Sequence, residues 1–209
     1  MATVGTGSRI LLQSTVTGTL ATAPGTVIEI ANDAPVFDGT GAAFNNPANV
    51  VIDPLGKLTL KGVINNTGSI TLTNPGSYPY NTDTETLDVA AVGVTLQGGG
   101  TVMLGGNYVS NNIITGDSAA ATLTNVDNTI SGAGNFGQGR LTLVNEAGGT
   151  INATGGTLYL NTGSNAISNA GLLEATNGGT LVIQSALNNS GIIEANGNGS
   201  HITSLRFIT

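Results

Sequence analysis

The chain has 209 residues, including 32 glycines, and is 39% hydrophobic but only 8% charged. This length supports one elongated domain with a buried interior, and the composition is the opposite of that of a disordered chain. The formal net charge of −7, the absence of cysteine and the lack of any run of about 18 apolar residues argue against nucleic-acid binding, disulfides and membrane insertion.

Residues 1–55 are predicted to form irregular N-terminal coils with loops. Short strands are expected at Arg9–Leu12, Val27–Ile30 and Val50–Ile52. Ala31–Ala48, with two prolines and two phenylalanines, is expected to leave the body of the molecule as a loop. The first residues lack the basic-then-apolar pattern of a secretory leader, which leaves the export route open.

An ungapped internal repeat follows. Gly56–Leu72 reads GKLTLKGVINNTGSITL and aligns with Gly179–Ala195, which reads GTLVIQSALNNSGIIEA. Each copy has a glycine, an alternating strand, an asparagine turn and a second alternating strand. Alternation directs every second side chain inward. The expected inward residues are Leu58, Leu60, Ile70, Leu72, Leu181, Ile183, Ile193 and Ala195.

Shorter copies of the repeat lie about twenty residues apart, at Gly149–Ala153, Gly171–Ala175 and Gly191–Ala195. A coil this short buries its apolar side only by stacking on its neighbours. The sequence therefore predicts a single all-β domain over residues 1–209, a right-handed parallel β-helix (β-solenoid) with about 20–22 residues per coil. Regular repeats are expected at 56–200, and glycine and asparagine are expected at corners with positive φ.

Two further segments depart from the repeat. Pro75–Asp83 contains two prolines and two tyrosines and is predicted to be a second loop. Residues 201–209 are expected to form a C-terminal cap or tail, because an open last coil would expose strand edges. A β-sandwich is the main rival fold, but the recurrence of one motif at coil spacing favours the solenoid.

Thr122–Phe136 reads TLTNVDNTISGAGNF and continues into GQGRLTLVNEAGGTINATGG. This stretch resembles the repeat regions of large bacterial surface proteins of the filamentous haemagglutinin and autotransporter passenger type. The resemblance covers roughly residues 56–200 and implies a right-handed β-helix, an extracellular or cell-surface location, and an adhesive, matrix or scaffold role. It carries no shared catalytic residues, and the chain shows neither the secretion domain nor the translocator barrel of such proteins.

Catalytic and metal-binding residues are scarce. The only histidine is His201, expected as a solvated residue of the tail, and there is no cysteine. Histidine-based triads and ordinary zinc sites are therefore excluded. We expect no cofactor and no enzymatic activity.

Glu174 and Glu194 are the one enzymatic hint. They occupy equivalent outward positions one coil apart, so their backbones are predicted to lie about 4.8 Å from each other. Such a pair could act as acid and nucleophile in a polysaccharide hydrolase or lyase. The same outward column holds Thr71 and Asn152 in other coils, which favours a solvated ladder instead.

Met103, Tyr159 and Val182 are predicted to point outward and to share one column. An exposed apolar stripe of this kind suggests self-association, while partial cover by a loop is the alternative. A threonine-based ice-binding face is less well supported, because these three residues interrupt the column. Together the patterns favour a structural or adhesive module of a bacterial cell-surface or extracellular matrix protein. It is expected to form homo-oligomers or fibres and to contact a host surface or polysaccharide, with a polysaccharide lyase or hydrolase as the alternative.

Overall fold

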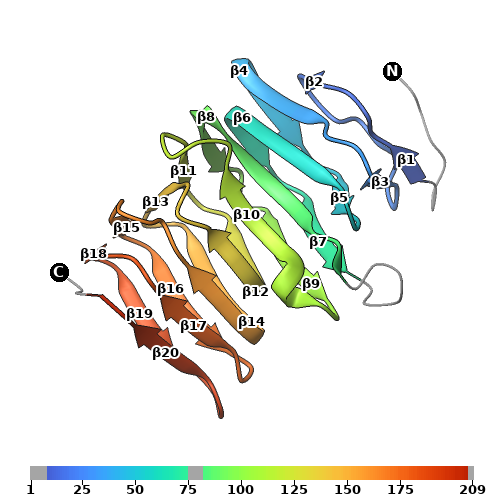
Figure 1. Ribbon diagram of the computed structural model, residues 1–209. Coiled ribbons are helices and arrows are strands. Elements are labelled where there is room, and N and C mark those ends of the chain that lie inside the picture. Colours follow the sequence, from blue (N-terminus) through green and yellow to red (C-terminus); the bar gives the residue numbers. More distant parts are fainter. Residues whose placement is uncertain (1–8, 75–81, 207–209) are drawn as a thin grey trace.

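The computed structural model describes residues 9–74 and 82–206, which wind into stacked coils with β1 and β20 at opposite ends of the stack (Figure 1). Every strand pairing in these residues is parallel. Each strand pairs with the equivalent strand of the next coil, so no coil is stable alone. The predicted all-β parallel β-helix is confirmed.

The coils have three faces. The first face stacks strands along the whole described chain: β1 (Arg9–Leu11), β3 (Val27–Ile30), β5 (Asn49–Ile52), β7 (Ser69–Asn74), β9 (Thr101–Gly106), the first parts of β12 (Thr129–Gly137) and β14 (Thr150–Leu160), β16 (Leu172–Thr176) and β19 (Ile192–Ala195).

Long strands bend from one face to the next. The second face contains β2 (Val16–Thr17), the first parts of β4 (Val36–Asn46), β6 (Lys57–Asn66) and β8 (Glu85–Gln97), then β10 (Asn112–Gly116), the ends of β12 and β14, β17 (Thr180–Ile183) and β20 (His201–Ser204). The third face contains the ends of β4, β6 and β8, then β11 (Thr122–Asn125), β13 (Thr142–Asn145), β15 (Ile167–Asn169) and β18 (Leu187–Asn189).

Coil length is regular except near the middle of the stack. Thr150 pairs with Leu172 and Leu172 with Ile192, which are spacings of 22 and 20 residues, as predicted. Ser69 instead pairs with Thr101, 32 positions later, and Thr101 with Thr129, 28 positions later. The additional residues include a bulge within β8 and a segment around the short 3-10 helix η2 (Val109–Asn111).

The predicted loop at Ala31–Ala48 is wrong. Most of it is β4, whose Phe37 and Phe44 are fully buried and stack with ring centroids 4.4 Å apart. Pro35 and Pro47 flank this strand and do not interrupt it, so neither removes a donor from the strand ladder. Residues 75–81 of the second predicted loop lie outside the described residues.

The predicted departure from the repeat at the C-terminus is also wrong for its first residues. His201–Ser204 form β20, which pairs in register with β17. His201 is exposed, as predicted. The predicted inward residues are fully buried except in this last coil, where Ile193 is half-buried and Ala195 is exposed. No further coil covers these two residues in the described chain.

A ladder of asparagine side chains runs inside the solenoid beside the turn that follows the third face. Its members are Asn46, Asn66, Asn128, Asn125, Asn145, Asn169 and Asn189, and all except Asn189 are buried. Between coils, an Nδ2 of one residue donates to the Oδ1 of the next at 2.7–2.9 Å. Asn125 and Asn128 join the two halves, because each accepts a hydrogen bond from the other. Each buried side-chain amide in the ladder thereby finds hydrogen-bond partners. Without them, its burial would cost folding free energy.

Glycines beside the ladder are needed for close approach. A Cβ on Gly171 would lie 2.3 Å from the backbone oxygen of Gly149, and one on Gly191 would lie 2.1 Å from that of Gly171. Neither glycine has positive φ. The expected positive φ is present at other turns, as at Gly163, Gly178 and Asn177. At Gly171 and Gly191, close contact with the preceding coil excludes a side chain instead.

Replacing one ladder residue tests its contribution to stability. Nδ2 of Asn145 donates to Oδ1 of Asn169 and to the backbone oxygen of Gly149, and its own Oδ1 accepts from Asn125. We expect Asn145→Leu to destabilise the protein by about 2–4 kcal/mol in urea unfolding, because it leaves buried polar partners unpaired. Asn198→Ala, at an exposed turn, is the control and should change stability by less than about 0.5 kcal/mol.

Candidate functional site

The predicted carboxylate pair lies where expected. Glu174 of β16 is in register with Glu194 of β19, and the column continues through Asn152 to Ser131. Partial burial, and then the neighbouring charge of Glu194, raise the pKa of the Glu174 carboxyl. The pair is thus two adjacent carboxyl groups on one strand surface, next to neutral polar side chains.

The predicted apolar stripe is only partly formed. Tyr159 of β14 and Val182 of β17 are neighbours on the second face, between Asn135 and Thr203. Met103 lies on the first face, in the column of Glu174 and Glu194, and is 47% exposed. Placing Met103 in the stripe was wrong because the same Gly-Thr-x-x-x pattern opens strands on both faces.

A groove lies beside Tyr159. Asn135 donates from Nδ2 to the backbone oxygen of Ser110 at 2.8 Å, which fastens the η2 turn to the second face. The groove has a volume of about 260 Å³, and its lining residues are Val109, Ser110, Gly134, Asn135, Thr157 and Tyr159. An aromatic ring, an amide and hydroxyl groups therefore meet on one surface.

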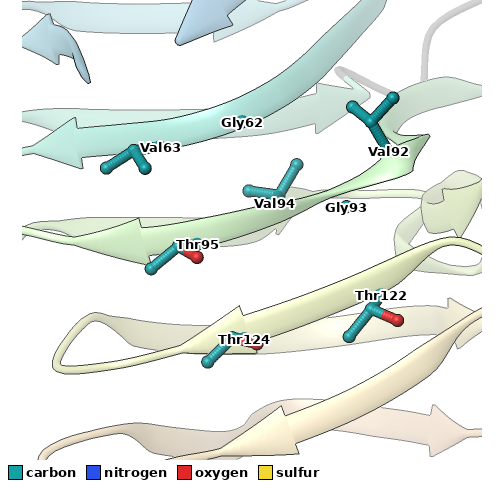
Figure 2. Close-up of a pocket in the computed structure, with 8 residues that line it drawn as sticks. All are labelled: Gly62, Val63, Val92, Gly93, Val94, Thr95, Thr122 and Thr124. Atoms are coloured by element: carbon teal, nitrogen blue, oxygen red, sulfur yellow. The ribbon is translucent and has the colours of Figure 1, made fainter. Parts of the chain in front are cut away.

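A second groove of about 290 Å³ lies on the third face (Figure 2). Val63, Thr95 and Thr124 form a column along it, and Val92, 68% exposed, projects from the bulge in β8 at its end. The remaining lining residues are Gly62, Gly93, Val94 and Thr122. Sequence reasoning missed this groove, although the run Ala90–Gly93, which breaks the alternation of β8, was a signal for it.

Glu85 is a buried carboxyl that the sequence did not single out. Its Oε1 accepts a hydrogen bond from Nδ2 of Asn74 at 2.9 Å, and its Oε2 has no partner among the described residues. Its cross-strand neighbour is Asn112, whose Oδ1 is likewise buried without a partner there. Burial raises the pKa of Glu85 to about 7. Protonation therefore creates a donor next to an unused acceptor.

A second perturbed carboxyl lies near the N-terminal end. Burial, together with the neighbouring Glu29, raises the pKa of Asp53 to about 6, against the opposing effect of Arg9. In the described part of the chain, no three His, Cys, Asp or Glu side chains are placed to hold a metal ion. Among the same residues, no helix is long and apolar enough to span a membrane.

No family model matches the chain, and no curated protein or solved structure shows significant similarity to it.

Glu85 is expected to make stability depend on pH. Because its folded pKa of about 7 lies above the ordinary value of 4.5, its contribution is fully present below pH 4.5 and is lost as the pH rises through 7. Glu85→Gln keeps an acceptor for Asn74 and adds a permanent donor beside Asn112. We expect the variant to be more stable than the unmodified protein at pH 8 by about 2 kcal/mol, and nearly equal at pH 4.5.

Urea unfolding at both pH values measures this difference. Asp53 titrates in the same range and its charge adds to the raised pKa of Glu85, so the measured difference includes this coupling between the two carboxyls. Glu146→Gln, at an exposed carboxyl, is the control. Equal stability of Glu85→Gln and the unmodified protein at pH 8 would show that Glu85 is not held neutral by the fold.

Proposed function

We propose that this chain is a structural or adhesive module of a bacterial cell-surface or extracellular matrix protein. It acts as a stiff rod that presents surface grooves to a partner and assembles into fibres. The observation that carries the proposal is the unbroken parallel pairing of the first face, from Arg9 of β1 to Ala195 of β19.

The interior is built to resist tension along the axis of the rod. Each coil is bonded to the next by parallel strands on three faces, and the buried asparagine ladder adds side-chain bonds in the same direction. Pulling one coil away breaks backbone bonds, ladder bonds and apolar contacts together. This arrangement suits a rod that keeps its shape between two points of attachment.

Of the two grooves, the one beside Tyr159 is the better candidate for adhesion. Tyr159 is 39% exposed, and the amide of Asn135 and the hydroxyl of Ser110 lie along the same groove. An aromatic ring flanked by neutral hydrogen-bonding groups suits a polysaccharide, whose sugar rings offer apolar faces and hydroxyls. With a formal net charge of −7, the chain favours a neutral polymer over an anionic one.

Register pairing of Glu174 with Glu194, and the raised pKa of Glu174, favour a second candidate function. Two carboxyl groups in register on one surface, one of them with a raised pKa, are the groups that acid-assisted glycoside cleavage uses. In that alternative the chain is a polysaccharide hydrolase or lyase, and its first face is the substrate surface.

Binding to immobilised neutral polysaccharides tests the adhesive function. We expect Tyr159→Ala to weaken binding at least tenfold, because it removes the aromatic wall of the groove. Thr71→Ala, on the first face, is the control and should bind normally. Release of reducing ends from the polysaccharide, abolished by Glu174→Gln and unaffected by Tyr159→Ala, would replace the adhesive function with the enzymatic one.

A further inference from the structure

The C-terminal end of the stack is an open coil. Among the described residues, β18, β19 and β20 pair on one edge only, with β15, β16 and β17. The inward side chains of Ile193 and Ile202 are only partly buried, and Ile192 is 59% exposed. Unpaired strand edges next to exposed apolar groups are a template for another parallel coil.

The N-terminal end is the matching surface. In the described chain β1 pairs only with β3, and β2 only with β4. Ile10 and Val16 are partly buried against the core, and Leu11 is 53% exposed. Because all strands are parallel, this coil exposes the opposite strand edge from the one that the C-terminal coil exposes. The two edges can therefore pair with each other.

The repeat fixes the register of such a contact. The first face aligns Arg9 with Val27 at one end, and Leu172 with Ile192 at the other. Continuing the column by one coil places Arg9 of a second copy opposite Ile192. The backbone oxygen of Gly171 accepts from the Ile192 N–H at 2.8 Å and from Asn169 Nδ2. The equivalent oxygen of Gly191 accepts from Asn189 Nδ2, and in this register it faces the incoming Arg9 N–H.

Charge is complementary in the same register. Within the chain, Nη1 of Arg9 donates to Oε2 of Glu29 at 2.8 Å, diagonally across one coil. In the proposed register, Leu11 of the incoming copy lies opposite Glu194, just as it lies opposite Glu29 in its own chain. Arg9 of that copy therefore has a glutamate diagonal to it in each of the two neighbouring coils. There the guanidinium would lie between two carboxylates, and it would offset the repulsion between Glu194 and Glu174.

We propose that a second copy of this chain stacks its N-terminal coil on the C-terminal coil, with Arg9 paired to Glu194, so that copies join head to tail. The inference rests on the proposed fibre-forming function and names its contact. Because the two surfaces differ, a contact of this kind repeats from copy to copy without closing. The asparagine ladder stops at this contact, because no strand of the described chain follows β20 on the third face and Leu20 takes the ladder position in the incoming coil. The contact is therefore weaker than those inside the chain.

Two reciprocal charge variants test the contact in the full chain. Arg9→Glu and Glu194→Lys each place like charges across the proposed interface when the variant is alone. In an equimolar mixture, the introduced glutamate of one variant meets the introduced lysine of the other. The remaining interface then pairs the unchanged Arg9 and Glu194. Glu146→Lys makes the same charge change at an exposed site away from both ends and is the matched control.

We expect the unmodified protein and Glu146→Lys to form filaments in negative stain and in sedimentation at 50 mM salt. Each charge variant alone should remain folded by circular dichroism and monomeric. The mixture should regain filaments, and 500 mM salt should shorten them. If Arg9→Glu does not fold, the other two variants still test the contact. Filaments should then be lost in Glu194→Lys and kept in Glu146→Lys.

Monomers of the unmodified protein at every concentration, unimpaired assembly by both charge variants, or a mixture of folded variants that stays monomeric would each overturn the head-to-tail contact. Fibres lost in Tyr159→Ala but kept in Glu194→Lys would also overturn it and would assign assembly to the second face. That outcome leaves the proposed structural function intact. Polysaccharide cleavage dependent on Glu174, by contrast, overturns the proposed function whatever the state of assembly.

Discussion

The structure depends most on the buried asparagine ladder. A carboxamide carries both a donor and an acceptor, so one asparagine satisfies the next only when the same residue recurs at the same place in each coil. Asn125, Asn145, Asn169 and Asn189 meet this condition directly. A shift by two residues keeps apolar side chains pointing inward, whereas the same shift in the ladder leaves buried amides unpaired. The ladder therefore fixes which residues of successive coils face each other, and with them the outward columns.

The composition follows from that constraint. Because coils pass close to each other beside the ladder, Gly171 and Gly191 have no room for a side chain. Outward strand positions such as Thr71, Asn152 and Thr203 hold neutral residues, in keeping with the low charged fraction of 8%. High glycine and asparagine content is common in flexible chains. In this protein it belongs to a closely packed interior.

Sequence reasoning identified what depends on local pattern. Leu58 and Leu60 were predicted inward from alternation, and both are fully buried. It failed where partners lie in other coils: Met103 was assigned to the wrong face because strands on two faces share one local motif. Glu85 was missed because its neighbour Asn112 lies across an irregular coil, whose pairing no spacing in the sequence reveals.

The regular and irregular coils have different roles. The long coils between Ser69 and Thr129 contain the bulge at Val92 and the η2 turn, and both grooves lie beside them. The buried Glu85 lies in the same region, so the least repetitive coils carry both surface grooves and this perturbed carboxyl. Regular coils on either side hold these features rigidly, because each neighbour is fixed in register. Insertions can therefore change the surface grooves of the rod while the strand columns and the ladder keep its shape.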